Sequence, residues 1–509
     1  MKFELGKGEL NTRVLSELAN TPGNDFKISS DTWQRLETFR AIIDKAAKGS
    51  EQVYGINTGF GFLANKKIPI DEVVQLQVNL IRSHACGVGE HSAPETVRAM
   101  MIIKTHNFLQ GNSGVSRECV EALLAFLKHD VIPVVPCKGS VGASGDLAPL
   151  SHIALGLMGE GEVYFEKQLQ NSKDVLKKLG LKPYTLKAKE GLALINGTQY
   201  MSGLGSLILE SSRTLMKAAD AISALSLDAT RGSLKAYDEK IHTVRKQPGQ
   251  LLVSQNVLAL FEGSDAIMDS HKDCGKVQDP YSFRCVPQVH GACRDLLKHV
   301  EVTLNHELNS ATDNPLVFEN GEIISGGNFH GQPIAFALDI LAMALAEIGS
   351  ISERRIEKMT NPHTSGLPAF LTKNEGLNSG FMIPHVVAAS LVSENKILSH
   401  PASVDSIPTS ADKEDHVSMG PISANKARQS ATNVSHILAI ELLTACQGLD
   451  VLKPLKPAKH LQAIHKELRK ISSFVDEDRV LSKEIEKVAK WLVDKGLDKA
   501  LDSSGLQLK

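Results

Sequence analysis

Apolar residues recur at helical spacing along much of the chain. Asp31 and Gln34 have the spacing of a capping box, and Phe39 and Ile43 follow on one helical face. Gly49 then provides a stop signal. We therefore predict an amphipathic helix between this capping box and Gly49.

Three further segments have helical patterns. Ser116 is a candidate N-cap for a second helix, and Pro133 interrupts the chain beyond that helix. After Pro333, residues 334–346 are almost all apolar, so we expect that helix to be buried on every side. The run is too short to span a bilayer. A long helix is also predicted from Pro421 to about residue 446, ended by Gly448.

Strand signals are few and short. They fall at residues 131–135, 162–165 and 316–324, the last around an Asn320-Gly321 hairpin turn. Because no repeat or flexible linker separates the helical segments, we predict a mainly α fold in which long helices form one bundle subunit. A helix that is apolar on every side needs neighbours all round, which favours an oligomer.

Composition narrows the functional class. Of 509 residues, 42% are apolar, 22% are charged and only 5% are aromatic, with a net charge of −2. Neither nucleic acid nor an anionic membrane surface is expected as a partner. The 7 cysteines form no C-x-x-C pair, and the N-terminus has no apolar signal segment. These features predict a cytoplasmic protein with reduced thiols.

Glycine-rich polar stretches interrupt the helical pattern, and each places glycines beside a residue capable of chemistry. Loops that carry function on a rigid scaffold have this character. The stretches are YGINTGFGFLA at 54–64, RSHACGVGE at 82–90, KGSVGASGDLAPLSH at 138–152, VQDPYSFRC at 277–285 and GGNFHGQP at 326–333. A sixth, ADKEDHVSMG at 411–420, has one glycine but carries carboxylates and a histidine.

Common catalytic motifs fit these stretches poorly. Residues 142–146 nearly match the nucleophile elbow G-x-S-x-G, but Asp146 stands where the last glycine is required. No P-loop is present, and His306-Glu307 lacks the second histidine of a zinc-protease motif, so no metal site is predicted. A serine hydrolase that uses Ser144 remains an alternative, as does a helical scaffold without activity.

The Ala143-Ser144-Gly145 sequence permits a different chemistry. In a compressed loop the Gly145 nitrogen can attack the Ala143 carbonyl carbon, since glycine offers no side chain to hinder the approach. Loss of one water closes a five-membered ring. Loss of the Ser144 hydroxyl as a second water leaves an exocyclic methylidene, which is an electrophile made from the chain itself.

The stretch GASGDLAPLSH resembles the prosthetic-group signature of the aromatic amino acid ammonia-lyase and aminomutase family, and the likeness extends over about residues 54–420. It implies 4-methylideneimidazol-5-one (MIO), formed autocatalytically from Ala143, Ser144 and Gly145, with no external cofactor. It also implies a fumarase/aspartase-like fold and a homotetramer with shared active sites. We expect residues 1–200 to carry the prosthetic loop on shorter helices, and residues 201–509 to form the long-helix bundle and C-terminal helices.

Within that family the stretches most resemble members that act on histidine. Ser83-His84 stands at the selectivity position, and Glu414-Asp415-His416 matches the same branch. The resemblance implies elimination of ammonia from L-histidine to give trans-urocanate, the first step of histidine degradation. A tyrosine ammonia-lyase or an aminomutase is the alternative. Lys413, Phe283 and Val286 depart from the commoner residues and bear only on fine selectivity.

The resemblance also assigns roles to single residues. Tyr54 is implied as the base that removes the β-proton, and Asn196 as a hydrogen-bond partner of the prosthetic group. Arg284 is implied to bind the substrate carboxylate, which suits its planar fork of donors. The remaining substrate-binding residues are His84 and Glu414 at the imidazole, Glu414 also as a possible acid or base, with Gln278, Tyr281 and Phe329.

Overall fold

The computed structural model describes residues 3–49, 51–59, 68–69 and 72–509, and they form two compact units. The first contains residues 1–210, 300–339 and 401–425, and the second contains the remaining stretches. Residues 60–64 of the first glycine-rich stretch lie outside the described residues. The expected division at residue 200 stays a prediction, because each unit combines stretches that are distant in sequence.

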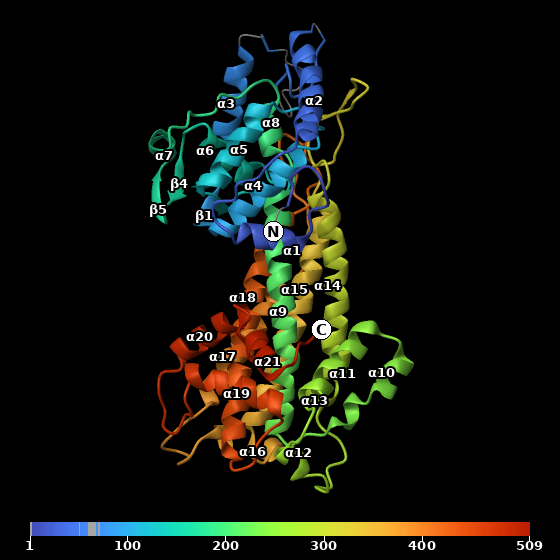
Figure 1. The fold of residues 1–509 in the computed structure, drawn as a ribbon, viewed down its shortest axis with the longest axis vertical. Helices are drawn as coiled ribbons and strands as arrows, with labels where there is room; N and C mark the ends of the chain where they lie inside the picture. The colour runs from blue at the N-terminus through green and yellow to red at the C-terminus, as the bar shows by residue number, and fades with distance from the viewer. Residues whose placement is uncertain (1–2, 50, 60–67, 70–71) are drawn as a thin grey trace. The chain divides into compact units, whose positions relative to one another are not determined.

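The described residues are mainly helical, as the sequence predicts (Figure 1). The helices longer than 20 residues have their residues divided between the two units. They are α9 (Gln199–Ala229), α14 (Val286–Leu308), α15 (Gln332–Thr360) and α18 (Gly420–Val451).

The first unit adds shorter helices and small antiparallel sheets, in which β1 pairs with β3, β4 lies between β2 and β5, and β6 pairs with β7. Its other helices are α1 (Thr12–Ala19), α2 (Ser30–Lys48), α3 (Val73–His84), α4 (Pro94–Phe108), α5 (Arg117–His129), α6 (Leu147–Leu157), α7 (Ser172–Lys178) and α8 (Glu190–Ile195). Its strands are β1 (Val88–His91), β2 (Ile132–Pro133), β3 (Pro136–Lys138), β4 (Glu162–Phe165), β5 (Gln168–Asn171), β6 (Leu316–Val317) and β7 (Ile323–Ile324).

The regular elements among the described residues of the second unit are helices, joined by loops. Besides its parts of the long helices it contains α10 (Glu239–Arg245), α11 (Pro248–Leu260), α12 (Ala266–Asp269), α13 (Tyr281–Arg284), α16 (Pro362–Ser365), α17 (Met382–Leu398), α19 (Lys459–Ile471), α20 (Ser482–Val493) and α21 (Gly496–Ser504). Short 3-10 turns lie at η3 (Leu234–Tyr237) and η4 (Ala369–Leu371).

Local signals predict the helix ends with mixed success. Ser116 does cap α5, accepting from the Cys119 amide at 3.4 Å, and Gly49 does end α2. The capping box was wrong, because α2 starts one residue before Asp31 and its N-cap position is Ser29. Gly448 was also wrong as a stop, since α18 continues to Val451 and packing overrides the cost of one glycine.

The apolar run after Pro333 belongs to a longer helix than expected. By length and composition alone, both α15 and α18 are long and apolar enough to cross a membrane. The prediction that the apolar run after Pro333 is too short to do so was therefore wrong. Burial inside the protein covers 67% and 89% of their most apolar windows, which accounts for this composition without a bilayer. Yet α15 is not buried on every side, because Phe336 and Met343 are 47% and 41% exposed.

A buried ion pair joins three long helices within the second unit. Glu441 of α18 accepts from Arg355 of α15 at 2.5 and 2.9 Å, and from Ser226 of α9 at 2.7 Å. Ser352 adds a fourth hydrogen bond at 2.5 Å. Both charged side chains are fully buried, so each depends on the other for compensation.

Removing one partner should therefore be costly. We expect Glu441→Ala to lower stability by about 3–5 kcal/mol, because Arg355 would be left as a buried, uncompensated charge. Thermal or denaturant unfolding measures the loss. In the exposed Arg117–Glu121 pair, the matched variant Glu121→Ala should cost less than about 1 kcal/mol. Equal losses in the two variants would contradict this interpretation.

Candidate active site

The Ala143-Ser144-Gly145 sequence forms a tight turn between β3 and α6. The Gly145 amide donates to the Gly142 carbonyl at 3.3 Å, and Ser144 has a left-handed backbone with φ 51°. Such a φ at the third position of a turn is unfavourable for a residue with a side chain. Ser140 braces the loop, accepting from the Gly142 amide at 3.1 Å and donating to the Gly145 carbonyl at 3.2 Å.

The backbone around Gly197 lies directly against this turn. The Gly197 amide donates to the Ser144 carbonyl at 3.3 Å, and the Asp146 amide donates to the Gly197 carbonyl at 2.7 Å. A Cβ atom at Gly145 would lie 2.2 Å from that carbonyl oxygen. Only glycine therefore permits the two backbone segments to approach so closely.

Asp146 ties the same turn to the start of α9. Its Oδ2 atom accepts from the Tyr200 and Met201 amides at 2.7 and 3.1 Å. The side chain is fully buried, and this burial raises the pKa of Asp146 to about 7 although both amide bonds oppose the shift.

Glu414 contacts the Ser144 hydroxyl, and its charge acts on His84. Ser144 Oγ donates to Glu414 Oε1 at 3.4 Å, and Thr409 Oγ1 donates to Oε2 at 2.9 Å. Burial lowers the pKa of His84, while the Leu80 carbonyl and the Glu414 charge act in the opposite direction. Because His84 Nδ1 lies 2.8 Å from the Leu80 carbonyl oxygen, the neutral ring carries its proton there and leaves Nε2 as an acceptor.

Asn196 belongs to a buried polar network below the turn. Its amide nitrogen donates to Asp313 Oδ1 at 3.3 Å and to the Asn314 carbonyl at 2.9 Å. Asp313 in turn pairs with Lys189 at 2.6 Å, and both of these charges are buried. The side chain of Asn196 is thus fixed in place by a rigid ion pair.

Tyr54 and Phe329 are partly buried on loops of the same unit. The turn at Tyr54 packs against α8, where a Cβ atom at Gly55 would lie 2.5 Å from Leu192. The Phe329 loop meets the Glu414 loop through stacked rings of His330 and His416, whose centroids are 5.9 Å apart.

The predicted carboxylate-binding residues belong to the second unit. Arg284 lies on α13 with its guanidinium carbon 4.4 Å from the ring centroid of Tyr281. Its buried Nε atom has no hydrogen-bond partner within the described part of the chain. Tyr281 is 71% exposed, and Gln278 is also exposed. The contacts described for these three residues are thus within the second unit, whereas those of the Ser144 turn are within the first.

Sequence reasoning missed several residues at the site. Asp146 was noted only as a failed motif position, although it stands directly after the reactive sequence. His330 and His416 occur inside quoted stretches but received no role. Lys104, which donates to the Asn196 carbonyl, had one signal, a lone charge at the end of the apolar run Met100–Ile103. Asp313 had none that we recognise.

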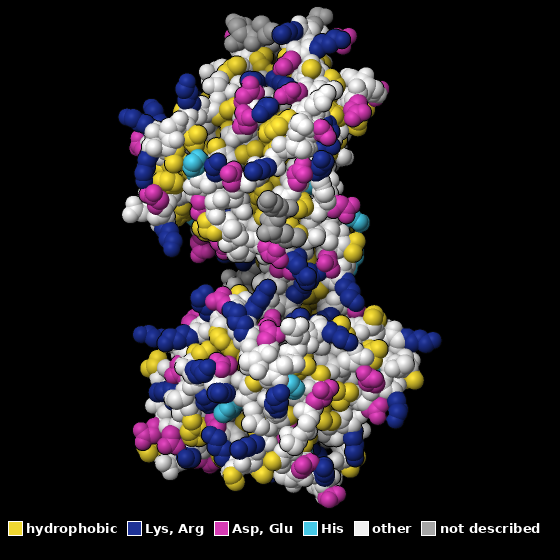
Figure 2. Space-filling view, in the orientation of Figure 1, with side chains coloured by type: hydrophobic (Ala, Val, Ile, Leu, Met, Phe, Trp, Pro, Cys, Tyr) yellow, Lys and Arg dark blue, Asp and Glu magenta, His cyan; other side chains and the backbone are white. Residues whose placement is uncertain are grey.

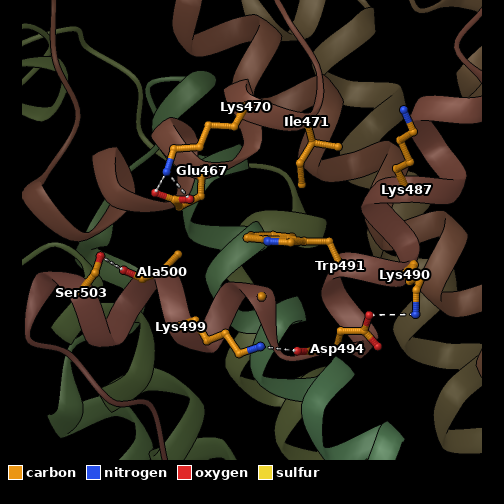
Figure 3. A pocket seen from close by; sticks show the side chains of 11 residues that line it. Glu467, Lys470, Ile471, Lys487, Lys490, Trp491, Asp494, Lys499, Ala500 and Ser503 are labelled. Carbon is orange, nitrogen blue, oxygen red and sulfur yellow. Dashed lines mark hydrogen bonds and ion pairs between the residues drawn. The ribbon is translucent and has the colours of Figure 1, made fainter.

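A hollow of about 830 Å³ lies on the second unit between α19, α20 and α21 (Figure 3). Its lining residues are distant in sequence from the predicted site residues. Trp491 extends across it, with lysines around its rim, and two of these are paired: Lys470 with Glu467 at 2.6 Å and Lys490 with Asp494 at 2.9 Å. None of the predicted site residues lines it.

Charges of both signs are interspersed over the visible face of the molecule (Figure 2).

The sequence of this chain is similar to those of a known enzyme family. The sequence model described as aromatic amino acid lyase matches residues 10–470. The chain belongs to the aromatic amino acid lyase family. This membership makes it a carbon–nitrogen lyase and sets aside the serine hydrolase alternative.

Relatives within the family differ in substrate. A histidine ammonia-lyase of Sorangium cellulosum is 50% identical, over 97% of this chain and 98% of that protein. The crystal structure of histidine ammonia-lyase from Trypanosoma cruzi is 45% identical with a TM-score of 0.91, covering 99% of this chain and 96% of that one. A tyrosine aminomutase from Streptomyces globisporus is 35% identical with a TM-score of 0.94, covering both chains fully.

The contact at Gly197 predicts a sharp difference between two glycines. Gly145→Ala should lower lyase activity by roughly a hundredfold or more, because the added Cβ atom forces the turn away from Gly197 and misplaces the reacting atoms. Gly180 has a similar backbone, with φ 69°, but a Cβ atom there would meet nothing within 4 Å. Gly180→Ala is therefore the control and should keep its activity. Similar activity in both variants would contradict the close-approach argument.

Proposed function

We propose that the protein eliminates ammonia from L-histidine to give trans-urocanate. The observation that carries the proposal is the 50% identity to a histidine ammonia-lyase over nearly the whole of both chains. The electrostatic interaction of His84 with Glu414 supports it, because a carboxylate and a neutral imidazole suit a polar, ionisable ring better than a phenyl ring. An aminomutase reaction is the alternative within the family, supported by the Streptomyces globisporus structure.

We further propose that Ala143, Ser144 and Gly145 become MIO. The residues fit this group, since the turn is tight, Ser144 is held in a left-handed backbone and Gly145 is pressed against Gly197. Once formed, the group supplies an electrophile that activates the substrate for loss of ammonia.

The chain's own residues bind the substrate and move the proton. In this proposal the Tyr54 phenol oxygen removes the β-proton, and Arg284 holds the carboxylate in its planar fork, supported by Tyr281 and Gln278. His84 Nε2 accepts from the imidazole N–H, and Glu414 binds the ring or exchanges a proton with it. Asn196 positions the prosthetic group, and Phe329 packs beside it.

We propose that the chain acts as a homotetramer in which active sites are shared between subunits. Large apolar side chains are exposed along α14, α15 and α17, and burying them would stabilise an assembly. They are Val302, Phe336, Met343, Ile383, Val386, Val387 and Ile397. Sharing would bring Arg284 of one subunit to the Ser144 turn of another. A cytoplasmic location stays a prediction.

Ser144→Ala tests the origin of the electrophile. We expect the purified variant to fold but to lack deamination of histidine, because no methylidene can form without the hydroxyl. The intact mass of the wild-type protein should be about 36 Da below the encoded value, which corresponds to two waters. The second loss should be missing from the variant. Wild-type activity in Ser144→Ala would disprove the proposal.

The substrate preference is tested by changing both ring-binding residues. Glu414→Gln with His84→Phe should reduce kcat/KM for histidine at least roughly tenfold more than for phenylalanine, because polar partners of the imidazole are lost while an apolar ring gains a neighbour. Steady-state kinetics on both amino acids measures the ratio. Equal losses of kcat/KM on the two substrates would mean that His84 and Glu414 do not discriminate between the imidazole and phenyl rings.

A further inference from the structure

Lys104 is a buried cation that the proposed reaction has not used. It lies on α4 with its side chain almost fully buried, and its ammonium group is 5.4 Å from the centroid of the Phe108 ring. The ammonium donates to the Ala193 carbonyl at 3.1 Å and also to the Asn196 carbonyl. Both carbonyls belong to the C-terminal end of α8, where a cation is favoured electrostatically.

One peptide group connects Lys104 to the reactive turn. The carbonyl of the Asn196–Gly197 peptide accepts from Lys104, and the amide of the same peptide donates to the Ser144 carbonyl at 3.3 Å. A peptide group is planar, so fixing its oxygen also fixes the direction of its N–H bond. The next carbonyl, that of Gly197, accepts from the Asp146 amide at 2.7 Å.

Several charged groups surround Lys104. Asp146 and Asp313 attract the ammonium, Lys189 repels it, and burial lowers the pKa of Lys104 to about 7. Each aspartate is itself held elsewhere, Asp146 by the first amides of α9 and Asp313 by Lys189. Because both aspartates already have other partners, the ammonium keeps the Ala193 and Asn196 carbonyls as its hydrogen-bond acceptors.

We propose that Lys104 is a positioning residue for ring closure, holding the Asn196–Gly197 peptide so that it presses the Ala143-Ser144-Gly145 turn into its compressed form. The inference rests on the proposed function, because it concerns how the electrophile of that function arises. Lys104 touches none of the reacting atoms and acts only through this peptide.

Ring closure and dehydration of the Ala143-Ser144-Gly145 turn need no added reagent. The Gly145 nitrogen forms a bond to the Ala143 carbonyl carbon, and the Ala143 oxygen leaves as water with the amide protons of Ser144 and Gly145. The Ser144 hydroxyl then leaves as a second water with the Ser144 Cα proton. Both losses are visible in the intact mass of the chain, independently of catalysis.

The test compares Lys104→Met with a matched variant on the same helix. Arg98 is also buried on α4, donates to the Ala19 carbonyl and pairs with Asp130 at 2.9 Å, and its hydrogen bonds within the described part of the chain do not reach the turn. Both full-length proteins are purified, and the fraction of chains with the 36 Da deficit is followed over time after synthesis by mass spectrometry. Unfolding midpoints are recorded for both variants.

We expect the deficit to form at least roughly tenfold more slowly in Lys104→Met, since a displacement of about 1 Å at reacting atoms costs on the order of a hundredfold in rate. Arg98→Met should lose stability yet acquire the deficit at the wild-type rate. A wild-type rate in Lys104→Met would overturn the proposal, and so would a complete deficit with reduced activity, because Lys104 would then act after closure.

Two further readouts keep the outcome decisive. If Lys104→Met does not fold, Lys104→Gln replaces it, because its amide is uncharged and shorter than the lysine but can still donate, and should give an intermediate rate of closure. A wild-type rate in that variant would overturn the proposal. If the wild-type protein itself shows no deficit, the proposed prosthetic group fails, a result distinct from failure at Lys104.

Discussion

The close approach of the Gly197 backbone to the Ala143-Ser144-Gly145 turn is the contact on which the active site depends. A carbonyl stands where any side chain at Gly145 would have to be, so sequence and geometry constrain each other at this point. Hydrogen bonds run in both directions between the two segments. These are ordinary backbone hydrogen bonds. Together they hold Ser144 in a left-handed backbone conformation that is unfavourable for a residue with a side chain.

Maintaining that contact requires charge inside a helical core. Lys104, Asp146, Lys189 and Asp313 are all nearly or fully buried, an arrangement that is unfavourable unless each group is paired or hydrogen-bonded. Here each group contacts either an opposite charge or the free end of a helix, namely the last carbonyls of α8 or the first amides of α9. The network therefore stabilises one geometry of the turn rather than simply adding stability.

The sequence predicted those features whose cause is local. The apolar run after Pro333, the Ser116 cap and the Asn320-Gly321 hairpin depend on neighbouring residues, and all three are present. The predictions that failed ignored more distant packing, as where α18 continues past Gly448. In the same way the reactive sequence could be recognised from its motif, but Lys104 lies about 40 residues before it along the chain, and only folding brings the two together.

The residues that contact the Ser144 turn and those proposed to bind the substrate carboxylate belong to different units. The groups that hold the turn, from Ser140 and Asp146 to Gly197 and Lys104, all belong to the first unit. Arg284 and Tyr281 belong to the second. If sites are shared between subunits, formation of the electrophile depends on folding within one unit, whereas substrate binding depends on assembly. In the proposed homotetramer the exposed apolar faces of α14, α15 and α17 would then contribute to catalysis, because their burial would bring Arg284 to the turn.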